Sequence, residues 1–390
     1  MRIVYVTETY PPELNGVAMT TCRTVAALRE RGHEVCVVRP HQPGHDDRAP
    51  ALAPTSDQLT FGLPIPMYPQ LRFGLASAAA LARRWRPLRP QLVHVATPGP
   101  LGAAAVVAGR RLGAAVTSDF RTHFQRYCGH YGLGLASGAV RGYLRWLHNQ
   151  AHRSFVPTDE AREELQQLGF ERLAVVGRGV DGEHFRPELR SAELRGAWGA
   201  TRPGQVVMLY VGRLAREKQP ELALAAFREA RRVRPGTRMV VIGDGPCRRR
   251  LEAEYPQALF LGVRTGIDLA RCYASADVFL FPSLTDTFGN VTLEALASGL
   301  VVVAYDTGAA RQHLRHGFDG VLCPKGDAQA FIERTQRAAL LALPPSPMRF
   351  EARRTALALK WRPVLQRFVD ELDEVSFQVH LEQMRHAALA

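Results

Sequence analysis

Short apolar runs alternate with longer stretches of helical periodicity along most of this 390-residue chain. The first apolar run, 2–7, leads into a loop with prolines and a glycine. Apolar residues then recur at helical spacing over 17–31 until Gly32, and a second apolar run follows at 34–38. Uninterrupted apolar strands on either side of an amphipathic helix are typical of parallel sheets covered on both faces. The N-terminal pattern therefore predicts a strand–helix–strand unit.

The same alternation recurs in two series, which are separated by a linker with one helix at 181–205. Further strands are expected at 91–95, 114–118, 154–157, 174–176, 206–211, 239–242, 258–261, 278–281 and 301–304. Further helices are expected at 102–112, 159–168, 220–233, 246–254, 290–298 and from 328 onward. We expect an α/β protein with two doubly wound domains, 1–185 and 186–360, that face each other across a cleft, and a helical segment at 361–390.

Composition indicates a globular protein, because 46% of the residues are hydrophobic and 22% are charged. No apolar run approaches the roughly 18–20 residues that span a bilayer. The N-terminus has neither the charged head nor the cleavage site of a signal peptide. We therefore expect a cytoplasmic protein.

The six cysteines, at positions 22, 36, 128, 247, 272 and 323, form no CxxC pair and no cluster with histidine. Free thiols are favoured over a zinc site or a disulfide framework. The net charge is +13. This surplus fits nucleic acid, an anionic membrane surface or phosphate-bearing small molecules, and it also fits a compositional bias toward arginine with no partner.

Candidate binding residues follow the expected strands, at the sheet edge where open parallel sheets bind ligands. Gly16 opens the first helix, whose free N–H groups favour an anion, although the loop is not a GxGxxG motif. Arg213 and Lys218 follow the strand that ends at 211 and offer cations to phosphate oxygens. Gly243 begins another tight turn from strand to helix.

The segment 282–294 joins a buried strand to a helix and carries two acids eight residues apart, Asp286 and Glu294. Gly289 and Asn290 open the helix, so its first N–H groups can meet an anion or a hydroxyl. Acids beside a phosphate site are explained by a ligand that also carries hydroxyls, which donate to carboxylates. The pattern therefore favours a sugar linked to a nucleoside diphosphate.

The chain resembles the retaining glycosyltransferases of family 4, which have the GT-B fold, over nearly its full length. The resemblance rests on an ordered set of segments: Tyr10-Pro11-Pro12 with Asn15-Gly16-Val17, 93–102, 130–134, 178–181, Gly212-Arg213 with Glu217-Lys218, and 286–294. The most similar branch contains GDP-mannose-dependent α-mannosyltransferases and sulfolipid synthases. The resemblance implies two Rossmann-like domains, acceptor-side and donor-side, and C-terminal helices that return to the first domain.

The resemblance also implies roles for residues of the second domain. Arg213 and Lys218 match the pair that neutralises the departing diphosphate, and Glu294 matches the acid that holds the donor ribose. Asp286 matches the first acid of the Glu-x7-Glu motif, which holds the transferred sugar, and is one methylene shorter than the usual glutamate. The remaining donor contacts that it implies are Gly16, Gly243, Val263, Phe288, Gly289 and Asn290.

One segment departs from the family pattern. Many relatives have a Ser-x-His-Thr-Asp-Phe segment whose histidine contacts the sugar, and here Arg121 takes the histidine position. Arg121 can donate to the sugar or the phosphate but cannot act as a base. We expect Arg121 to be a catalytic residue in the cleft, with His123 as the alternative.

The resemblance implies a retaining reaction in which the leaving diphosphate takes the acceptor proton and the protein stabilises the developing charge. No Asp-x-Asp occurs in the sequence, so we expect no metal and no cofactor. The expected partners are a GDP- or UDP-hexose donor and a lipid or glycan acceptor. Two segments that mix cations with aromatics, 83–89 and 141–148, suggest a peripheral association with an anionic membrane, or simply a solvated basic face.

Other classes of protein fit less well. A nucleotide-sugar epimerase on the same fold needs a histidine near the sugar, where this chain has Arg121, and a phosphorylase needs a pyridoxal lysine. A basic module for nucleic acid needs clustered charge and stacking aromatics, but the arginines are spread and aromatics are only 8%. The donor base, the hexose, the acceptor and the oligomeric state stay open.

Overall fold

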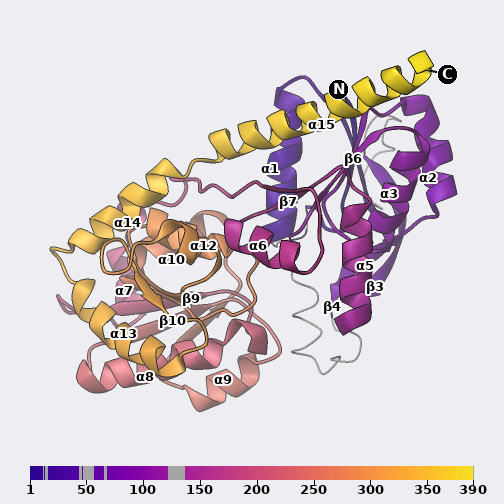
Figure 1. Ribbon diagram of the computed structural model, residues 1–390. Coiled ribbons are helices and arrows are strands. Elements are labelled where there is room, and N and C mark those ends of the chain that lie inside the picture. The colour runs from indigo at the N-terminus through magenta and orange to yellow at the C-terminus, as the bar shows by residue number, and fades with distance from the viewer. Residues whose placement is uncertain are drawn as a thin grey trace. The chain divides into compact units, whose positions relative to one another are not determined.

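The computed structural model describes residues 1–11, 13, 16–43, 46, 57–65, 68–121 and 137–389. These residues form two compact units (Figure 1). Unit 1 contains the described residues up to 121, then 137–177 and the C-terminal stretch from Pro363. Unit 2 contains Arg178–Arg362.

Within its described residues, unit 1 has an eight-stranded sheet with the order β4-β3-β2-β1-β5-β6-β7-β8. The strands are β1 (Arg2–Val6), β2 (Glu34–Pro40), β3 (Gln58–Ile65), β4 (Tyr68–Leu75), β5 (Leu92–Val95), β6 (Ala115–Asp119), β7 (Arg153–Val156) and β8 (Leu173–Val175). All neighbours run parallel except β3 and β4. The strand order reverses between β1 and β5, which is the point where open α/β sheets bind ligands.

Helices cover both faces of this sheet (Figure 1). Helix α1 (Gly16–Glu30) and the C-terminal helix α15 (Trp361–Leu389) pack on one face, where Leu28, Phe368 and Leu372 share a core with the strands. The opposite face holds α2 (Ala78–Trp85), the 3-10 helix η2 (Arg86–Leu88), α3 (Pro100–Arg111) and α5 (Ser137–Asn149). Helix α6 (Asp159–Gln167) packs beside β7 and β8.

Unit 2 has a six-stranded sheet, parallel throughout, with the order β11-β10-β9-β12-β13-β14. The strands are β9 (Val207–Val211), β10 (Arg238–Ile242), β11 (Leu259–Gly262), β12 (Val278–Phe281), β13 (Val301–Tyr305) and β14 (Val321–Cys323). The first strand of the unit lies at the centre, and the order reverses between β9 and β12, as in dinucleotide-binding folds.

Two helical layers also enclose the sheet of unit 2. One layer consists of α7 (Ala192–Ala197), α10 (Gly266–Ser275), α11 (Asn290–Ala297), α12 (Gly308–His313) and α14 (Pro347–Ala358). The other consists of α8 (Pro220–Val233), α9 (Arg248–Glu254) and α13 (Ala328–Leu341). Two 3-10 helices, η4 (Pro187–Leu189) and η5 (Arg216–Lys218), precede α7 and α8.

Local sequence signals set many of the helix starts. The side chains of Ser77, Thr158 and Asp327 accept N–H groups in the first turns of α2, α6 and α13. Pro220 begins α8, where its missing N–H costs nothing. Residues Ala223, Leu224, Phe227 and Ala230 then form the buried stripe of that helix.

The prediction of an α/β protein built on doubly wound sheets is confirmed in both units. Several elements were not expected: the hairpin β3–β4, the helices α2, α5, α10 and α12, and the edge strand β14. Helix α9 begins at Arg248, two residues after the predicted start, because Gly245 and Pro246 belong to the preceding turn.

The limit of the first domain was expected after residue 185, but residues 178–185 belong to unit 2. Val180 and Phe185 are buried in the core of unit 2. The Arg353 side chain also donates to the backbone oxygens of Gly182 and Phe185, at 2.9 and 2.7 Å. These contacts move the boundary toward the N-terminus.

Asp277, at the amino end of β12, is the centre of a buried charge cluster in unit 2. It is 4% exposed, and its carboxylate oxygens lie 2.6, 2.9 and 3.2 Å from the guanidinium nitrogens of Arg190, Arg195 and Arg349. Its Oδ2 also accepts the backbone N–H of Val207, at the start of β9. The cluster fixes the amino ends of the two central strands.

Replacing Asp277 with alanine should destabilise unit 2 by about 3 kcal/mol, because the change leaves the partly buried Arg195 and Arg349 without their shared carboxylate. Urea unfolding followed by circular dichroism measures the loss. Glu333→Ala, which removes an exposed acid of α13, is the control and should change stability by less than about 1 kcal/mol. Equal effects of the two substitutions would contradict a structural role for Asp277.

Candidate active site

The candidate donor residues of unit 2 lie at the carboxyl ends of its strands, around the switch between β9 and β12. The β9 turn carries Arg213 and leads into η5, and the β12 turn carries Asp286 and leads into α11. Gly243, in the β10 turn, has φ +131°, and a Cβ there would lie 1.9 Å from the Gly212 oxygen. Only glycine allows these two turns to pack so closely.

Lys218 and Asp286, which were expected at the same edge of the sheet, are in direct contact. The Nζ of Lys218 lies 2.7 Å from Oδ1 of Asp286. The hydroxyl of Thr285 donates to the Glu217 oxygen at 3.5 Å, which also links the two turns. A cation for phosphate and an acid for hydroxyls therefore share one edge of the sheet.

Arg213 lies beside this pair. Its side chain is about one-third exposed, and its Nη1 is 3.9 Å from Oε1 of Glu217, whose side chain is buried. The backbone oxygen of Arg213 accepts the hydroxyl of Tyr210 at 3.1 Å. Burial, with smaller contributions from Asp286 and other acids, raises the pKa of Tyr210 well above its usual value, so this hydroxyl stays a donor.

The loop from Asp286 to Asn290 is fixed by close backbone contacts. Gly289 has φ +91° and precedes α11 directly. The Phe288 oxygen accepts the N–H of Ala309 at 2.7 Å, and a Cβ on Gly308 would lie 2.6 Å from the same oxygen. The start of α12 thereby holds the backbone that leads to Asn290.

Glu294 lies in the second turn of α11 and accepts the hydroxyl of Tyr273 at 3.0 Å through Oε2. Tyr273 is fully buried in α10, and burial together with Glu294 raises its pKa well above the usual value. The tyrosine hydroxyl therefore stays a donor and orients the carboxylate of Glu294. Tyr273 belongs to a helix that the sequence analysis missed.

Val263 follows the edge strand β11 and is 55% exposed. It lies at the same end of the sheet as Gly243, whose N–H donates to the Gly262 oxygen at 2.9 Å. Strand β10 separates β11 from β9, so Val263 is set apart from Lys218 along this edge. A ligand that reaches both positions has to be elongated.

Arg121 does not have the geometry expected of a cleft residue. Its side chain is only 5% exposed and pairs with Asp119 through Nε and Nη2. The guanidinium also donates to the hydroxyls of Thr21 and Tyr5 at 3.0 and 3.2 Å and to the Val17 oxygen at 3.4 Å. In this structure these acceptors surround the guanidinium, and the role of Arg121 as a sugar contact stays a prediction.

The remaining candidates of unit 1 are described in part. Gly16 is exposed and is the first residue of α1, and its oxygen accepts the hydroxyl of Thr20 at 2.7 Å. Asn15, His123 and the segment 130–134 lie outside the described residues. The expectation for His123 therefore stays a prediction.

Glu8, at the carboxyl end of strand β1 in unit 1, was not among the predicted site residues. It follows β1, and its Oε1 accepts the N–H of Leu101, at the start of α3, at 3.1 Å. Its own N–H donates to the Thr97 hydroxyl at 2.8 Å. Burial raises the pKa of Glu8 to about 8, against smaller lowering contributions from the backbone N–H groups of Leu101, Gly74 and Gly99. Glu8 thus joins the β1 and β5 turns at the switch point of unit 1.

A cavity of about 810 Å³ in unit 1 lies at the opposite edge, where β7 and β8 begin, under α15. Two of its cations, Arg110 and Arg172, bind backbone oxygens at the C-terminal end of α5, those of Gln150 and Ala151, at 2.7 and 3.1 Å. These arginines therefore satisfy the helix end. The cavity is separate from the candidate site.

Several negative findings concern the described residues. They contain no group of three or more His, Cys, Asp or Glu side chains placed to hold a metal ion. Cys22, Cys36, Cys247, Cys272 and Cys323 are free thiols, and Cys128 is not described. No helix in the described ranges combines the length and apolarity needed to cross a bilayer.

Comparison with known proteins identifies the family. Residues 14–184 match the model described as Glycosyltransferase Family 4, and residues 205–339 match the one described as Glycosyl transferases group 1. A GDP-mannose-dependent alpha-mannosyltransferase of Mycobacterium tuberculosis (strain CDC 1551 / Oshkosh) is 33% identical, over 96% of this chain and 97% of the relative. The chain belongs to glycosyltransferase family 4. The resemblance drawn from the motifs is confirmed.

Other similar proteins agree with this assignment. The sulfoquinovosyl transferase of Arabidopsis thaliana is 30% identical over 79% of this chain and 60% of its own length. The structure of Anabaena HepE in complex with UDP has a TM-score of 0.74 at 16% identity and covers 96% of this chain and 100% of that chain. The sucrose-phosphate synthase of Thermosynechococcus elongatus has a TM-score of 0.73 at 17% identity and covers 96% of this chain and 98% of that chain. The family 4 protein therefore has the GT-B fold and is a glycosyltransferase, and an epimerase, a phosphorylase or a basic binding module is not favoured.

Replacing Glu8 with glutamine should flatten the pH dependence of stability. Between the unfolded pKa near 4.5 and the folded pKa of about 8, the folded chain holds a proton that the unfolded chain has lost, so the free energy of unfolding falls as the pH rises. Urea unfolding at about pH 5, 7 and 8.5 should show a smaller fall in Glu8→Gln than in the wild type. The control Glu30→Gln, on the exposed face of α1, should keep the wild-type slope. An unchanged slope in Glu8→Gln would rule out this titration.

Proposed function

We propose that this family 4 enzyme is a retaining transferase that moves mannose from GDP-mannose to a lipid or glycan acceptor. Transfer of a hexose from a nucleotide sugar follows from the family, and the choice of mannose rests on relatives named as GDP-mannose-dependent enzymes. The single structural observation that carries the proposal is the contact between Lys218 and Asp286 at the switch point of unit 2. One edge of the sheet thereby presents groups suited to a diphosphate and to a sugar.

Lys218 and Arg213 are proposed to stabilise the leaving diphosphate. The negative charge on its oxygens grows as the glycosidic bond breaks, and fixed cations beside these oxygens lower the barrier because they interact most strongly with the transition state. Neighbouring helix starts, such as that of α11, add partial positive charge. We propose that these groups make a metal ion and a cofactor unnecessary.

The acids are proposed to hold the two sugars of the donor. Asp286 accepts from hydroxyls of the transferred hexose, and Glu294, oriented by Tyr273, accepts from the ribose hydroxyls. The backbone of Phe288, Gly289 and Asn290 is held firmly enough to position the hexose. The base lies toward Gly243 and Val263, where the elongated site extends to β11.

The geometry of the reaction accounts for the lack of a dedicated base in this scheme. The acceptor hydroxyl attacks from the face that the diphosphate leaves, and a diphosphate oxygen takes its proton. The bond from the sugar to the diphosphate breaks as the bond to the acceptor oxygen forms. The enzyme contributes position and electrostatic stabilisation.

Lys218→Ala should lower the rate of transfer at least about 100-fold, because it removes a cation from the developing charge. Release of GDP from GDP-mannose, and of UDP from UDP-glucose as the second donor, measures the activity with a lipid or glycan acceptor. Lys360→Ala, an exposed lysine at the end of unit 2, is the control and should act like the wild type. Wild-type turnover in a folded Lys218→Ala variant would contradict the role of Lys218 in stabilising the diphosphate. Turnover with UDP-glucose but not with GDP-mannose would contradict GDP-mannose as the donor.

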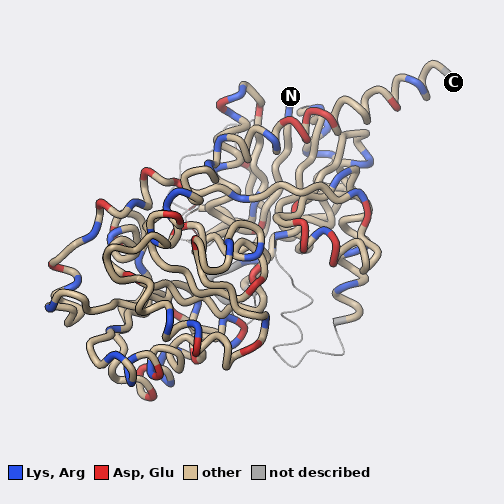
Figure 2. The backbone as a smooth tube through the Cα atoms, turned by 60° about the vertical axis from the view of Figure 1, so that its left-hand side comes forward, with Lys and Arg blue, Asp and Glu red and all other residues tan. Residues whose placement is uncertain are grey.

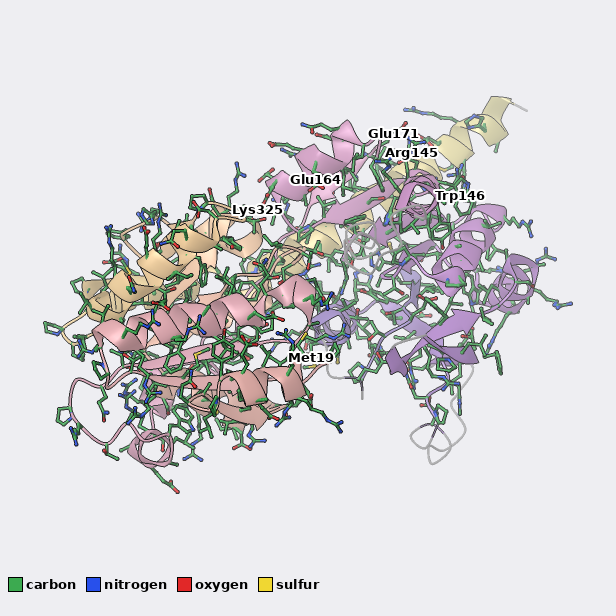
Figure 3. All side chains as sticks on the ribbon, turned by 90° about the horizontal axis from the view of Figure 1, so that it is seen from below. Met19, Arg145, Trp146, Glu164, Glu171 and Lys325 are labelled. Carbon is green, nitrogen blue, oxygen red and sulfur yellow. The ribbon has the colours of Figure 1, made fainter. Side chains whose placement is uncertain are left out.

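Helix α5 of unit 1 is proposed to contact an anionic membrane that carries a lipid acceptor. Tyr143 and Trp146 are 37% and 44% exposed, with ring centroids 6.2 Å apart, and Arg141 and Arg145 are exposed on the same helix. Arg145 and Trp146 project from α5 in Figure 3. Its other face, with Leu144 and Leu147, is buried. Rings at the headgroup level beside cations are typical of interfacial helices.

Cations are spread over both units rather than concentrated on this helix (Figure 2), so the aromatic pair distinguishes α5 from a merely basic surface. Trp146→Ala should weaken co-sedimentation with anionic liposomes at least about threefold, because the indole loses its place among the headgroups. The control Phe377→Ala removes another exposed ring of unit 1, on α15, and should bind as the wild type does. Equal loss in both variants, or equal binding to neutral and anionic liposomes, would contradict the membrane surface.

A further inference from the structure

The carboxylate of Asp286 is engaged by Lys218 in this structure. Its Oδ1 lies 2.7 Å from the Lys218 ammonium. Its Oδ2 is buried and has no hydrogen-bond partner among the residues that the structure describes. In this arrangement neither oxygen is presented to a sugar hydroxyl, although Asp286 is the acid proposed to hold the sugar.

Two features of this arrangement are energetically unfavourable. A buried acceptor without a partner costs about 1–3 kcal/mol relative to a satisfied one. Gln219, directly after Lys218, has a left-handed backbone with φ +48°, which is also unfavourable for a residue with a side chain. Both features adjoin the Lys218–Asp286 pair, whose side chains are 14% and 24% exposed. The ion pair is therefore a state that a better partner for Lys218 can replace.

We propose that the Lys218–Asp286 pair is an exchange latch, in which the diphosphate of the donor draws Lys218 away from Asp286 and thereby releases Asp286 to the hexose. The inference rests on the proposed function and assigns an order to its two recognition events. The diphosphate offers several charged oxygens where Asp286 offers one, so it competes effectively for the ammonium. Once released, the carboxylate turns its buried oxygen toward the sugar hydroxyls and gains the donors that it lacks.

The same exchange favours departure of the product. After transfer the sugar no longer occupies Asp286, and the carboxylate competes again for Lys218. The nucleoside diphosphate then loses its cation and faces a like charge, so its affinity falls relative to that of the donor. The latch thus distinguishes the intact donor from the spent nucleotide.

A simpler explanation for part of this behaviour is repulsion between Asp286 and the diphosphate through space, with no exchange of Lys218. The two explanations differ in how they depend on the lysine. If Asp286 acts by holding Lys218, removal of its charge matters only while Lys218 is present. If Asp286 acts by repulsion alone, removal of its charge raises affinity equally with and without the lysine. A double-mutant cycle separates these cases.

The test measures the affinity of GDP, and of UDP in parallel, by isothermal titration calorimetry of the full chain. The proteins are the wild type, Asp286→Asn, Lys218→Met and the double variant, each checked for an unchanged thermal unfolding midpoint. We expect Asp286→Asn to bind the nucleoside diphosphate about 5–10-fold more tightly, and the same change in the Lys218→Met background to alter affinity less than about twofold. Asp244→Asn, which removes a different acid from the same sheet edge, should leave the affinity close to that of the wild type.

An equal gain from Asp286→Asn in both backgrounds, or no gain in either, overturns the latch. The proposed function still stands in either case if the wild type binds the nucleoside diphosphate and releases it from the sugar nucleotide. Binding of neither GDP nor UDP to the wild type, together with no release of either from its hexose conjugate, overturns the proposed function and the latch with it. If Asp286→Asn tightens GDP binding in the wild-type background but not in the Lys218→Met background, the result supports both the latch and the proposed function.

Discussion

The pairing of β9 with β12 is the constraint on which the candidate site depends. The two strands are distant in sequence, yet Val278 and Phe279 lie in register with Met208 and Leu209. Because both strands run in the same direction, their carboxyl ends emerge side by side, and so do Lys218 and Asp286. At the other end, Asp277 joins the same two strands through the N–H of Val207. This strand pair is thus joined at its amino ends by the Asp277 charge cluster and holds the candidate site residues at its carboxyl ends.

Opposite charges serve this site better than a purely cationic pocket would. A diphosphate alone requires cations, but a hexose and a ribose require acceptors, and both kinds of group have to share a few ångströms of sheet edge. In unit 2 the acids are neutralised locally, Asp286 by Lys218 and Glu217 by Arg213, while Glu294 is held by a tyrosine hydroxyl. The arrangement keeps the edge close to neutral while each group stays within reach of a different part of the ligand.

The sequence predicted those parts of the fold that depend on short-range pattern. Buried parallel strands are continuous apolar runs, so their positions and the residues directly after them, including Arg213, Lys218 and Asp286, could be inferred without the structure. The hairpin β3–β4 and helix α10 were missed because their apolar residues are few or mixed with polar ones. Their stability comes from packing against the sheet edge and the neighbouring helices, which a local pattern does not contain.

The candidate residues of unit 1 show where such reasoning ends. An arginine after a strand has the same appearance in sequence whether it points outward or inward. Only the structure shows that Asp119, Thr21 and Tyr5 enclose the Arg121 guanidinium. Glu8 was equally hidden, since its partner Leu101 is far away along the chain and the interaction is with the backbone.

The C-terminal helix has a consequence for how the chain is made. Phe368, Val369, Leu372, Val375 and Val379 complete a core whose other buried members come from the first half of the sequence. Until those residues leave the ribosome, α1 alone covers this face of the N-terminal sheet, whereas the described residues of unit 2 form one continuous stretch, 178–362, and can pack together earlier. Unit 1, whose sheet is synthesised first, therefore completes its core last, and the part of its apolar face that α15 covers is exposed to chaperones or to aggregation in the meantime.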